Sequence, residues 1–172
     1  KYSPLRSVKG IDRAQVVILL MAATELATSQ DTHISNYILE AHKGIVLAIN
    51  KWDLAKQINL KKHEAIRKVQ ERFNFASHAP ICFVSALRKS GTENLVNEAR
   101  AVFQQWNMKI PRYDLRRTVL NSVSANPPAS TGRHALKLCG VTQDQSGPPS
   151  FTFYVNRSDM VHFSYKRYLE NS

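Results

Sequence analysis

Short unbroken apolar runs alternate with stretches of helical spacing through residues 1–108. The runs, 14–21, 44–49 and 80–85, are rich in branched aliphatic residues, as is typical of strands buried on both faces of a parallel sheet. Apolar residues three or four positions apart predict helices over residues 4–13, 31–41, 60–75 and 92–106, with Thr28 or Ser29 as the N-cap of the second. Strands that alternate with helices predict a doubly wound, parallel α/β sheet.

The pattern changes near Met108, where residues 109–112 form a linker whose proline a helix does not easily cross. Beyond this linker the spacing predicts a helix over 113–123, strands over 135–141 and 151–155 with a turn-rich stretch over 143–149, and a helix over 159–169. The order α-β-β-α predicts a small α+β domain of about 60 residues. The chain is therefore expected to divide into domains at 1–108 and 109–172.

The charge of the chain favours an anionic partner. The 172 residues carry 24 Lys and Arg against 13 Asp and Glu, a net charge of +11. Residues 1–108 contribute +6 (15 basic minus 9 acidic) and residues 109–172 contribute +5 (9 minus 4), so the excess is spread over both domains. A protein with this excess of positive charge most often binds nucleic acid. The alternative is that the basic residues only make the surface soluble.

Several classes of function lack a signal in the sequence. No apolar stretch is long enough for a transmembrane helix, and residues 1–4 do not have the layout of a signal peptide. The six histidines and two cysteines show no metal-ligand spacing, and no Ser-His-Asp order lies in a nucleophile context, so no metal site and no catalytic residue are predicted. Cys82 and Cys139 lie in apolar or strand-like runs and are expected to be reduced, packed thiols.

The strongest motif follows the run 44–49, where Asn50-Lys51-Trp52-Asp53 reads N-K-x-D. The Asp53 carboxylate can accept two hydrogen bonds, from the ring N–H and the exocyclic amine of guanine, and adenine lacks that pair of donors. The Asn50 amide can bond the outer edge of the purine, and the Lys51 stem can lie along the base. A surface corner between strand and loop, capped by an aspartate, is the alternative.

A second loop follows the run 80–85 at the corresponding place, where Ser85-Ala86-Leu87 can offer the Ala86 N–H to the guanine carbonyl. Ligands of open α/β sheets bind outside the carboxyl ends of the strands, where both loops are expected to lie. The predicted guanine-binding residues are thus Asn50, Lys51, Asp53, Ser85, Ala86 and Leu87.

The chain resembles the Der (EngA) family of tandem-domain, Era-like GTPases along its whole length. The likeness lies in residues 1–3 (Lys-Tyr-Ser) with the helix after them, 50–54 (Asn-Lys-Trp-Asp-Leu), 148–151 (Pro-Pro-Ser-Phe) and 161–171 (Val-His-Phe-Ser-Tyr-Lys-Arg-Tyr-Leu-Glu-Asn). The resemblance implies that 1–108 is the second half of the second GTPase domain, with a partial P-loop-GTPase-type parallel sheet and flanking helices. It implies that 109–172 is most of a small α+β KH-like domain.

The same resemblance implies a parent protein that binds GTP and GDP, hydrolyses GTP with Mg²⁺ and acts in assembly of the large ribosomal subunit. Its implied partners are rRNA and the ribosome, with the KH-like domain docked on the GTPase domains within the chain. The implied location is the bacterial cytoplasm, or an organellar stroma or matrix in a eukaryote.

The sequence departs from the family pattern most clearly in its lack of a G-x-x-x-x-G-K-[ST] phosphate loop. The chain is therefore expected to be an internal fragment that binds guanine nucleotides weakly and does not hydrolyse GTP. The family usually has Asp at Ala22 and Gly at Leu26, which leaves the loop conformation there open. The family also continues beyond Ser172, so the KH-like domain is expected to be incomplete at its C-terminus.

The KH-like part carries no G-x-x-G loop, which disfavours clamping of a single strand. Candidate phosphate contacts are Arg116, Arg117, Lys166 and Arg167, for which a solvated face is an equal alternative. Phe163, Tyr165 and Tyr168 are expected to pack in the core rather than to stack on bases. Three interpretations remain open: part of a GTP-hydrolysing assembly factor, an rRNA-docking module with an incomplete nucleotide pocket, or an unrelated α/β protein in which the motifs occur by chance.

Overall fold

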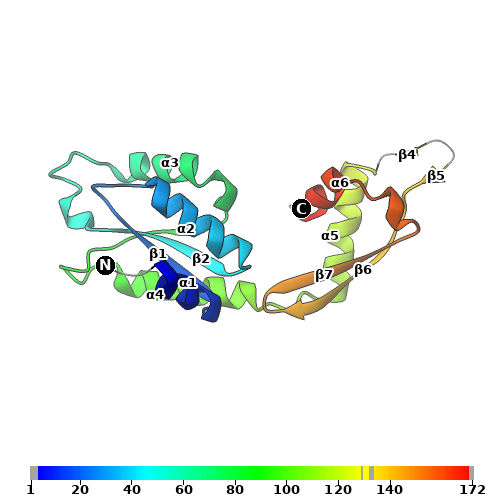
Figure 1. Ribbon diagram of the computed structural model, residues 1–172, viewed down its shortest axis with the longest axis horizontal. Helices are drawn as coiled ribbons and strands as arrows, with labels where there is room; N and C mark the ends of the chain where they lie inside the picture. The colour runs from blue at the N-terminus through cyan, green and yellow to red at the C-terminus, as the bar shows by residue number, and fades with distance from the viewer. Residues whose placement is uncertain (1–3, 129, 132–133, 171–172) are drawn as a thin grey trace. The chain divides into compact units, whose positions relative to one another are not determined.

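The computed structural model describes residues 4–128, 130–131 and 134–170, so that the family-like residues 1–3 and 171 lie outside the described residues (Figure 1). The chain divides into two compact units, Lys1–Trp106 and Asn107–Ser172.

The first unit is a parallel sheet with helices, which confirms the predicted fold class (Figure 1). The strands β1 (Val16–Ala22), β2 (Gly44–Asn50) and β3 (Ile81–Phe83) lie in the order β1-β2-β3. Val16 pairs with Gly44, and Leu47 pairs with Ile81. The helices of this unit are α1 (Pro4–Arg13), α2 (Ser29–Glu40), α3 (Lys62–Arg72) and α4 (Thr92–Trp106).

The core of the first unit forms around β2, the central strand. Its residues from Ile45 to Ile49 are each at most 1% exposed, because helices cover both faces of the sheet. On one face Leu47 lies in a cluster with Ile38 of α2 and Val69 of α3. On the other face α4 lies so close that a Cβ on Gly44 would be 2.7 Å from Val102 Cγ1. A larger residue at position 44 would therefore force the Val102 side chain of α4 to shift.

Helix ends in the first unit follow local hydrogen bonding. Of the two candidate caps of α2, Thr28 is the one used: its hydroxyl accepts the Asp31 N–H at 3.2 Å, and the Asp31 carboxylate accepts the Thr28 N–H at 2.9 Å. The predicted helix 60–75 is too long. Lys61 is extended and caps α3, and Phe73 leaves helical geometry and leads into the short 3₁₀ turn η2 (Asn74–Ala76).

The second unit has the α+β content expected of a KH-like domain. Its main elements are α5 (Arg112–Ala125), β6 (Leu138–Ser146), β7 (Pro149–Val155) and α6 (Phe163–Glu170). Its shorter elements are β4 (Ser130–Thr131), β5 (His134–Ala135) and the 3₁₀ turn η3 (Ser158–Met160). The antiparallel pair β6–β7 packs on α5 through a small core of Leu115, Val119 and Val141.

The predicted turn-rich stretch 143–149 is wrong. β6 continues to Ser146, and only Gly147-Pro148, joined by a cis peptide bond, separates it from β7. Tertiary contacts extend the strand, because Gln143 pairs with Phe151 and its side chain accepts the Ile110 N–H at 2.7 Å.

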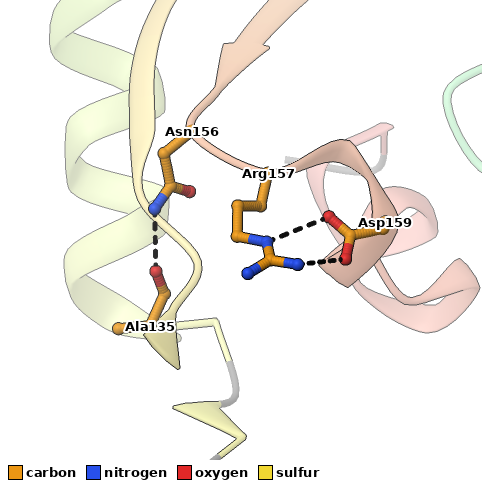
Figure 2. Close-up of polar contacts among 4 residues, drawn as sticks. All are labelled: Ala135, Asn156, Arg157 and Asp159. Carbon is orange, nitrogen blue, oxygen red and sulfur yellow. Dashed lines mark hydrogen bonds and ion pairs between the residues drawn. The ribbon is translucent and has the colours of Figure 1, made fainter. Parts of the chain in front are cut away.

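The helix predicted over residues 159–169 begins at Phe163 in the structure, four residues later than predicted. The preceding residues form η3, where the Arg157 guanidinium binds both carboxylate oxygens of Asp159, at 3.2 and 2.8 Å. Figure 2 shows this pair beside Asn156, whose amide donates to the Ala135 carbonyl at 3.0 Å. Polar side chains thus fix the chain where it leaves β7.

Two packing expectations in the second unit are also wrong. Cys139 is exposed, because it lies at an irregularity of β6 between Leu138 and Gly140. Phe163 is 73% exposed at the first position of α6. Tyr168 is partly buried and donates its hydroxyl to the Ser122 carbonyl of α5 at 2.8 Å, as expected of a packing residue. In the first unit Cys82 is buried as expected, which raises the pKa of its thiol.

Within the described part of the chain, no helix is long and apolar enough to cross a membrane.

Candidate functional site

The N-K-x-D residues lie where β2 ends and the chain turns sharply. Asn50 is the last residue of β2, and Lys51 adopts the left-handed conformation with φ 59°. The Asn50 side chain stabilises this turn, because its Oδ1 accepts the Lys51 N–H at 2.8 Å. Trp52 then begins the 3₁₀ turn η1 (Trp52–Leu54), which places Asp53 beside the end of β3.

The second predicted loop is joined directly to the first. Ser85 is 1% exposed, and its hydroxyl donates to Asp53 Oδ1 while it accepts the Arg88 N–H at 3.2 Å. The Ala86 N–H donates to Asn50 Oδ1 at 3.1 Å. Figure 1 shows both loops at the same end of the sheet, as parallel strands require. The structure thus brings Asn50, Asp53, Ser85 and Ala86 together.

The Asp53 carboxylate is held in its ionised form. The Ser85 hydroxyl bond is the largest cause that lowers the pKa of Asp53, assisted by a backbone N–H and by the charge of Arg88. Partial desolvation opposes these effects without reversing them. At neutral pH the side chain is therefore an acceptor of hydrogen bonds only, as two N–H donors of a base require.

Two of the predicted residues behave differently from the simplest expectation. The Ala86 N–H, expected to face a guanine carbonyl, donates to Asn50 Oδ1 in this structure, so that a carbonyl must share or displace that bond. Leu87 is 85% exposed.

An aromatic pair beneath the two loops was missed in the sequence. The Trp52 and Phe83 rings meet edge to face with centroids 4.4 Å apart, and the backbone N–H of Trp52 donates to the Val84 carbonyl at 3.0 Å. The Lys62 ammonium lies 5.4 Å from the centre of the Phe83 ring. Aromatic residues at the free position of N-K-x-D and within the third apolar run were the available signal.

Gly91 is a further residue whose importance the sequence did not indicate. Ser85 and Ser90 exchange two backbone hydrogen bonds of 3.0 and 3.1 Å, which closes the second loop. Gly91 follows with φ +76°, and a Cβ there would lie 2.2 Å from the Phe83 carbonyl oxygen. Only glycine satisfies both conditions without a shift of the backbone.

The loop in which the sequence departs from the family pattern also reaches the site. The Ala23 N–H donates to the Asn50 carbonyl at 2.8 Å, and the Glu25 N–H donates to the Ala22 carbonyl at 3.0 Å. A tight turn after β1 therefore forms without the usual residues at Ala22 and Leu26.

The predicted phosphate contacts lie on exposed faces of the second unit. Arg116 and Arg117 are exposed on α5, where Arg117 pairs with Asp114 at 3.3 Å and lies 5.7 Å from the Tyr113 ring centre. The two cations of α6, Lys166 and Arg167, are exposed as well.

A hollow of about 930 Å³ lies in the second unit beside the start of α6, lined in part by Pro127, Leu136 and Phe163, and it contains none of the predicted guanine-binding residues. No group of three or more His, Cys, Asp or Glu residues that could hold a metal ion occurs among the residues that the structure describes.

Comparison with known proteins agrees with the two-unit description. Residues 6–105 match the elongation factor Tu GTP binding domain, and residues 109–172 match the KH-domain-like, C-terminal domain of EngA bacterial GTPase enzymes. GTPase Der of Chloroflexus aggregans is 41% identical over 172 residues, which are 99% of this chain and 38% of the relative. GTPase Der of Halalkalibacterium halodurans is 36% identical over 171 residues, 99% of this chain and 39% of the relative.

Among solved structures, Era in complex with MgGDPNP and nucleotides of 16S ribosomal RNA is 16% identical with a TM-score of 0.46, covering 99% of this chain and 66% of that chain. The chain spans about two fifths of the length of the Der relatives it matches. With a GTP-binding segment followed by an EngA-type KH-like domain, the chain belongs to the Der (EngA) family of GTPases.

Proposed function

We propose that this chain is the guanine-reading and KH-like part of a GTP hydrolase that acts in assembly of the large ribosomal subunit. The observation that carries the guanine-reading part of the proposal is the bond from the buried Ser85 hydroxyl to the Asp53 carboxylate, and the assembly role rests on the family resemblance alone. This bond fixes an ionised acceptor beside the loop that carries the Ala86 N–H. Family membership supports GTP as the nucleotide.

In this proposal Asp53 accepts the ring N–H and the exocyclic amine of guanine, and Asn50, Lys51 and Ala86 contact the edge and face of the base. Ser85 and Leu87 complete the loop. Adenine presents no matching pair of donors, so its binding would leave the carboxylate unpaired. Sites built on such a pattern reject the mismatched analogue by roughly 10⁴-fold or more.

Hydrolysis is assigned to residues outside these 172. The sequence contains no G-x-x-x-x-G-K-[ST] loop, which in such enzymes cradles the phosphates and holds Mg²⁺ through its Ser or Thr. We therefore expect the whole protein to hydrolyse GTP with Mg²⁺ and this chain alone to show no magnesium-dependent release of phosphate.

Titration with fluorescent GDP and ADP tests the guanine proposal. The wild-type chain should prefer GDP, and Asp53→Asn should abolish that preference because an amide presents a donor to the guanine amine. Glu71→Gln is a matched control, because this carboxylate is 70% exposed on α3 away from the loops. Equal affinity of the wild-type chain for GDP and ADP, or an unchanged preference in Asp53→Asn, would contradict the proposal.

The second candidate function is docking on rRNA through the second unit, favoured by the exposed cations of α5 and α6. In this proposal Arg116, Arg117, Lys166 and Arg167 contact phosphates, and the KH-like domain packs on the GTPase domains of the whole protein. We propose that the whole protein acts in the bacterial cytoplasm, since the relatives are bacterial, or in an organellar stroma or matrix if the source is a eukaryote. Binding of large-subunit rRNA that weakens steeply with salt, without nucleotide binding, would favour this function alone.

A further inference from the structure

The side chain at the free position of N-K-x-D packs inward. Trp52 is partly buried and meets the Phe83 ring edge to face, with centroids 4.4 Å apart. Both rings also pack on the main core cluster of the first unit. An edge-to-face contact between two aromatic rings depends on their mutual orientation, so it restricts the two chain segments more than contact between aliphatic side chains does. The first base-reading loop is therefore attached to β3 at a position that the motif leaves free.

The ring pair lies directly before the two groups that the loops bring together. Trp52 precedes Asp53 by one residue, and Phe83 precedes Ser85 by two residues. The backbones are joined at the same place, because the backbone N–H of Trp52 donates to the Val84 carbonyl at 3.0 Å. A displacement of either ring therefore displaces the Ser85 hydroxyl relative to the Asp53 carboxylate that accepts its hydrogen bond.

Phe83 is restrained by two further contacts. Gly91 lies so close to its backbone that a Cβ at position 91 would be 2.2 Å from the Phe83 carbonyl oxygen. The ammonium of Lys62, the first residue of α3, lies 5.4 Å from the centre of the ring. A cation at the start of a helix is unfavourable beside the helix dipole, and attraction to an aromatic ring compensates for it. The Phe83 ring is thus a fixed surface against which Trp52 packs.

We infer that Trp52 and Phe83 are positioning residues for guanine recognition, because their ring contact holds the Asp53 carboxylate where both of its oxygens can accept hydrogen bonds from one base. The inference rests on the proposed guanine-reading function and adds to it a determinant outside the residues that contact the base. A displaced carboxylate can still accept one hydrogen bond, whereas two bonds to one base edge require a fixed geometry. The ring pair is therefore most important for keeping both bonds at once.

The test compares the binding of GDP with that of inosine diphosphate (IDP), whose base lacks the exocyclic amine and leaves one bond of the carboxylate unmade. Trp52→Leu removes the ring contact and keeps an apolar side chain, and Phe83→Leu removes the contact from the other partner. Trp52→Phe keeps an aromatic ring. Phe75→Leu is the matched control, because it removes a ring contact with Phe73 (centroids 6.0 Å apart) before the start of β3, whereas the loops follow the strands. Circular dichroism confirms that each variant is folded.

We expect the wild-type chain, Trp52→Phe and Phe75→Leu to bind GDP about tenfold or more tightly than IDP, because the lost bond is one to a charged acceptor. In Trp52→Leu and in Phe83→Leu the preference for GDP should fall to about threefold or less, and the double variant should lose no more, because both changes remove the same contact. An unchanged preference in a folded leucine variant would mean that the rings only pack the core, and would overturn the inference. An equal loss of preference in Phe75→Leu would also overturn it.

Amide hydrogen exchange gives a second measurement that needs no nucleotide. The N–H groups of Ala86 and Arg88 donate within the joined loops at 3.1 and 3.2 Å, so their protection reports how firmly the loops are held. In Trp52→Leu both amides should exchange about tenfold or more faster, with exchange in the centre of β2 unchanged. Unchanged exchange of both amides would overturn the positioning role by itself. A wild-type chain without preference for GDP over ADP would instead contradict the proposed function, so the two failures are distinguishable.

Discussion

The two units reach a folded state by different means. In the first, five consecutive residues of β2 are at most 1% exposed between helices on both faces of the sheet. In the second, the buried cluster contains Leu115, Val119 and Val141, each 8–9% exposed. The deep core of the first unit gives a rigid support to the loops after β2 and β3, whose hydrogen bonds need fixed positions. The second unit, with its smaller core, relies on side-chain hydrogen bonds to join its elements.

The comparison predicts its largest effect in the centre of β2. Leu47→Ala should lower the free energy of unfolding of the first unit by about 2–5 kcal/mol, because it leaves a cavity between helices and sheet. In the second unit, Val119→Ala should cost about 2 kcal/mol or less. Urea unfolding followed by tryptophan fluorescence reports the first unit, since it holds both Trp52 and Trp106, and hydrogen exchange reports the second. A loss of unfolding free energy in Val119→Ala that exceeds the loss in Leu47→Ala would contradict this difference between the two units.

The next largest effect is expected at Gly91, at the edge of the same scaffold. Gly91→Ala should destabilise the first unit by about 1–3 kcal/mol, because it combines a positive φ with a Cβ that meets the Phe83 carbonyl. GDP binding should fall with it, since the second loop must shift. Gly10→Ala is the control, because nothing lies within 4 Å of a Cβ there. Comparable unfolding curves for the two variants would show that the loop is not rigid.

Loss of the side-chain hydrogen bonds that join elements of the second unit should lower its stability by an intermediate amount. Gln143→Ala removes the acceptor of the Ile110 N–H and the donors to the Met108 and Gln145 carbonyls. We expect a loss of about 1–2 kcal/mol in the second unit, with the first unit unchanged. Hydrogen exchange of the Ile110 amide measures it directly. Unchanged protection of that amide would mean that the small core alone holds the unit.

The smallest effect is a pH dependence in the first unit. Because the pKa of Asp53 is lowered in the folded chain, its contribution to stability is present above its unfolded pKa of about 4 and is lost as pH falls through the folded value. Ser85→Ala removes the main cause of the lowered pKa and should flatten the loss of stability as pH falls below the unfolded pKa of about 4. Thermal unfolding of both forms over that range measures the difference. Identical pH profiles would exclude the Ser85 bond as the cause.

Sequence patterns were sufficient for elements whose burial is local and regular. The three apolar runs became the parallel strands, and the helical spacing placed α2 and α4 closely. Sequence patterns were insufficient where a segment distant in the chain determines the length of a strand or the burial of a side chain. β6 extends to Ser146 because β7 pairs with it, and Cys139 is exposed because the ladder is irregular there. Neither cause is visible in a window of neighbouring residues.

The same division holds for the candidate site. Asn50, Asp53, Ser85 and Ala86 could be found from motif and spacing, and the structure joins them by hydrogen bonds. The support given by Phe83 and the requirement for glycine at position 91 depend on the approach of one backbone to another, which spacing does not encode.

Asn50 has a consequence for experimental design. Its backbone carbonyl accepts the Ala23 N–H, and its side chain accepts the Lys51 and Ala86 N–H groups, so a single residue fastens the ends of β1, β2 and β3. A substitution at this position loosens three chain segments together with any contact to a base. Any effect of a substitution at position 50 on nucleotide binding would therefore be inseparable from its effect on this end of the sheet.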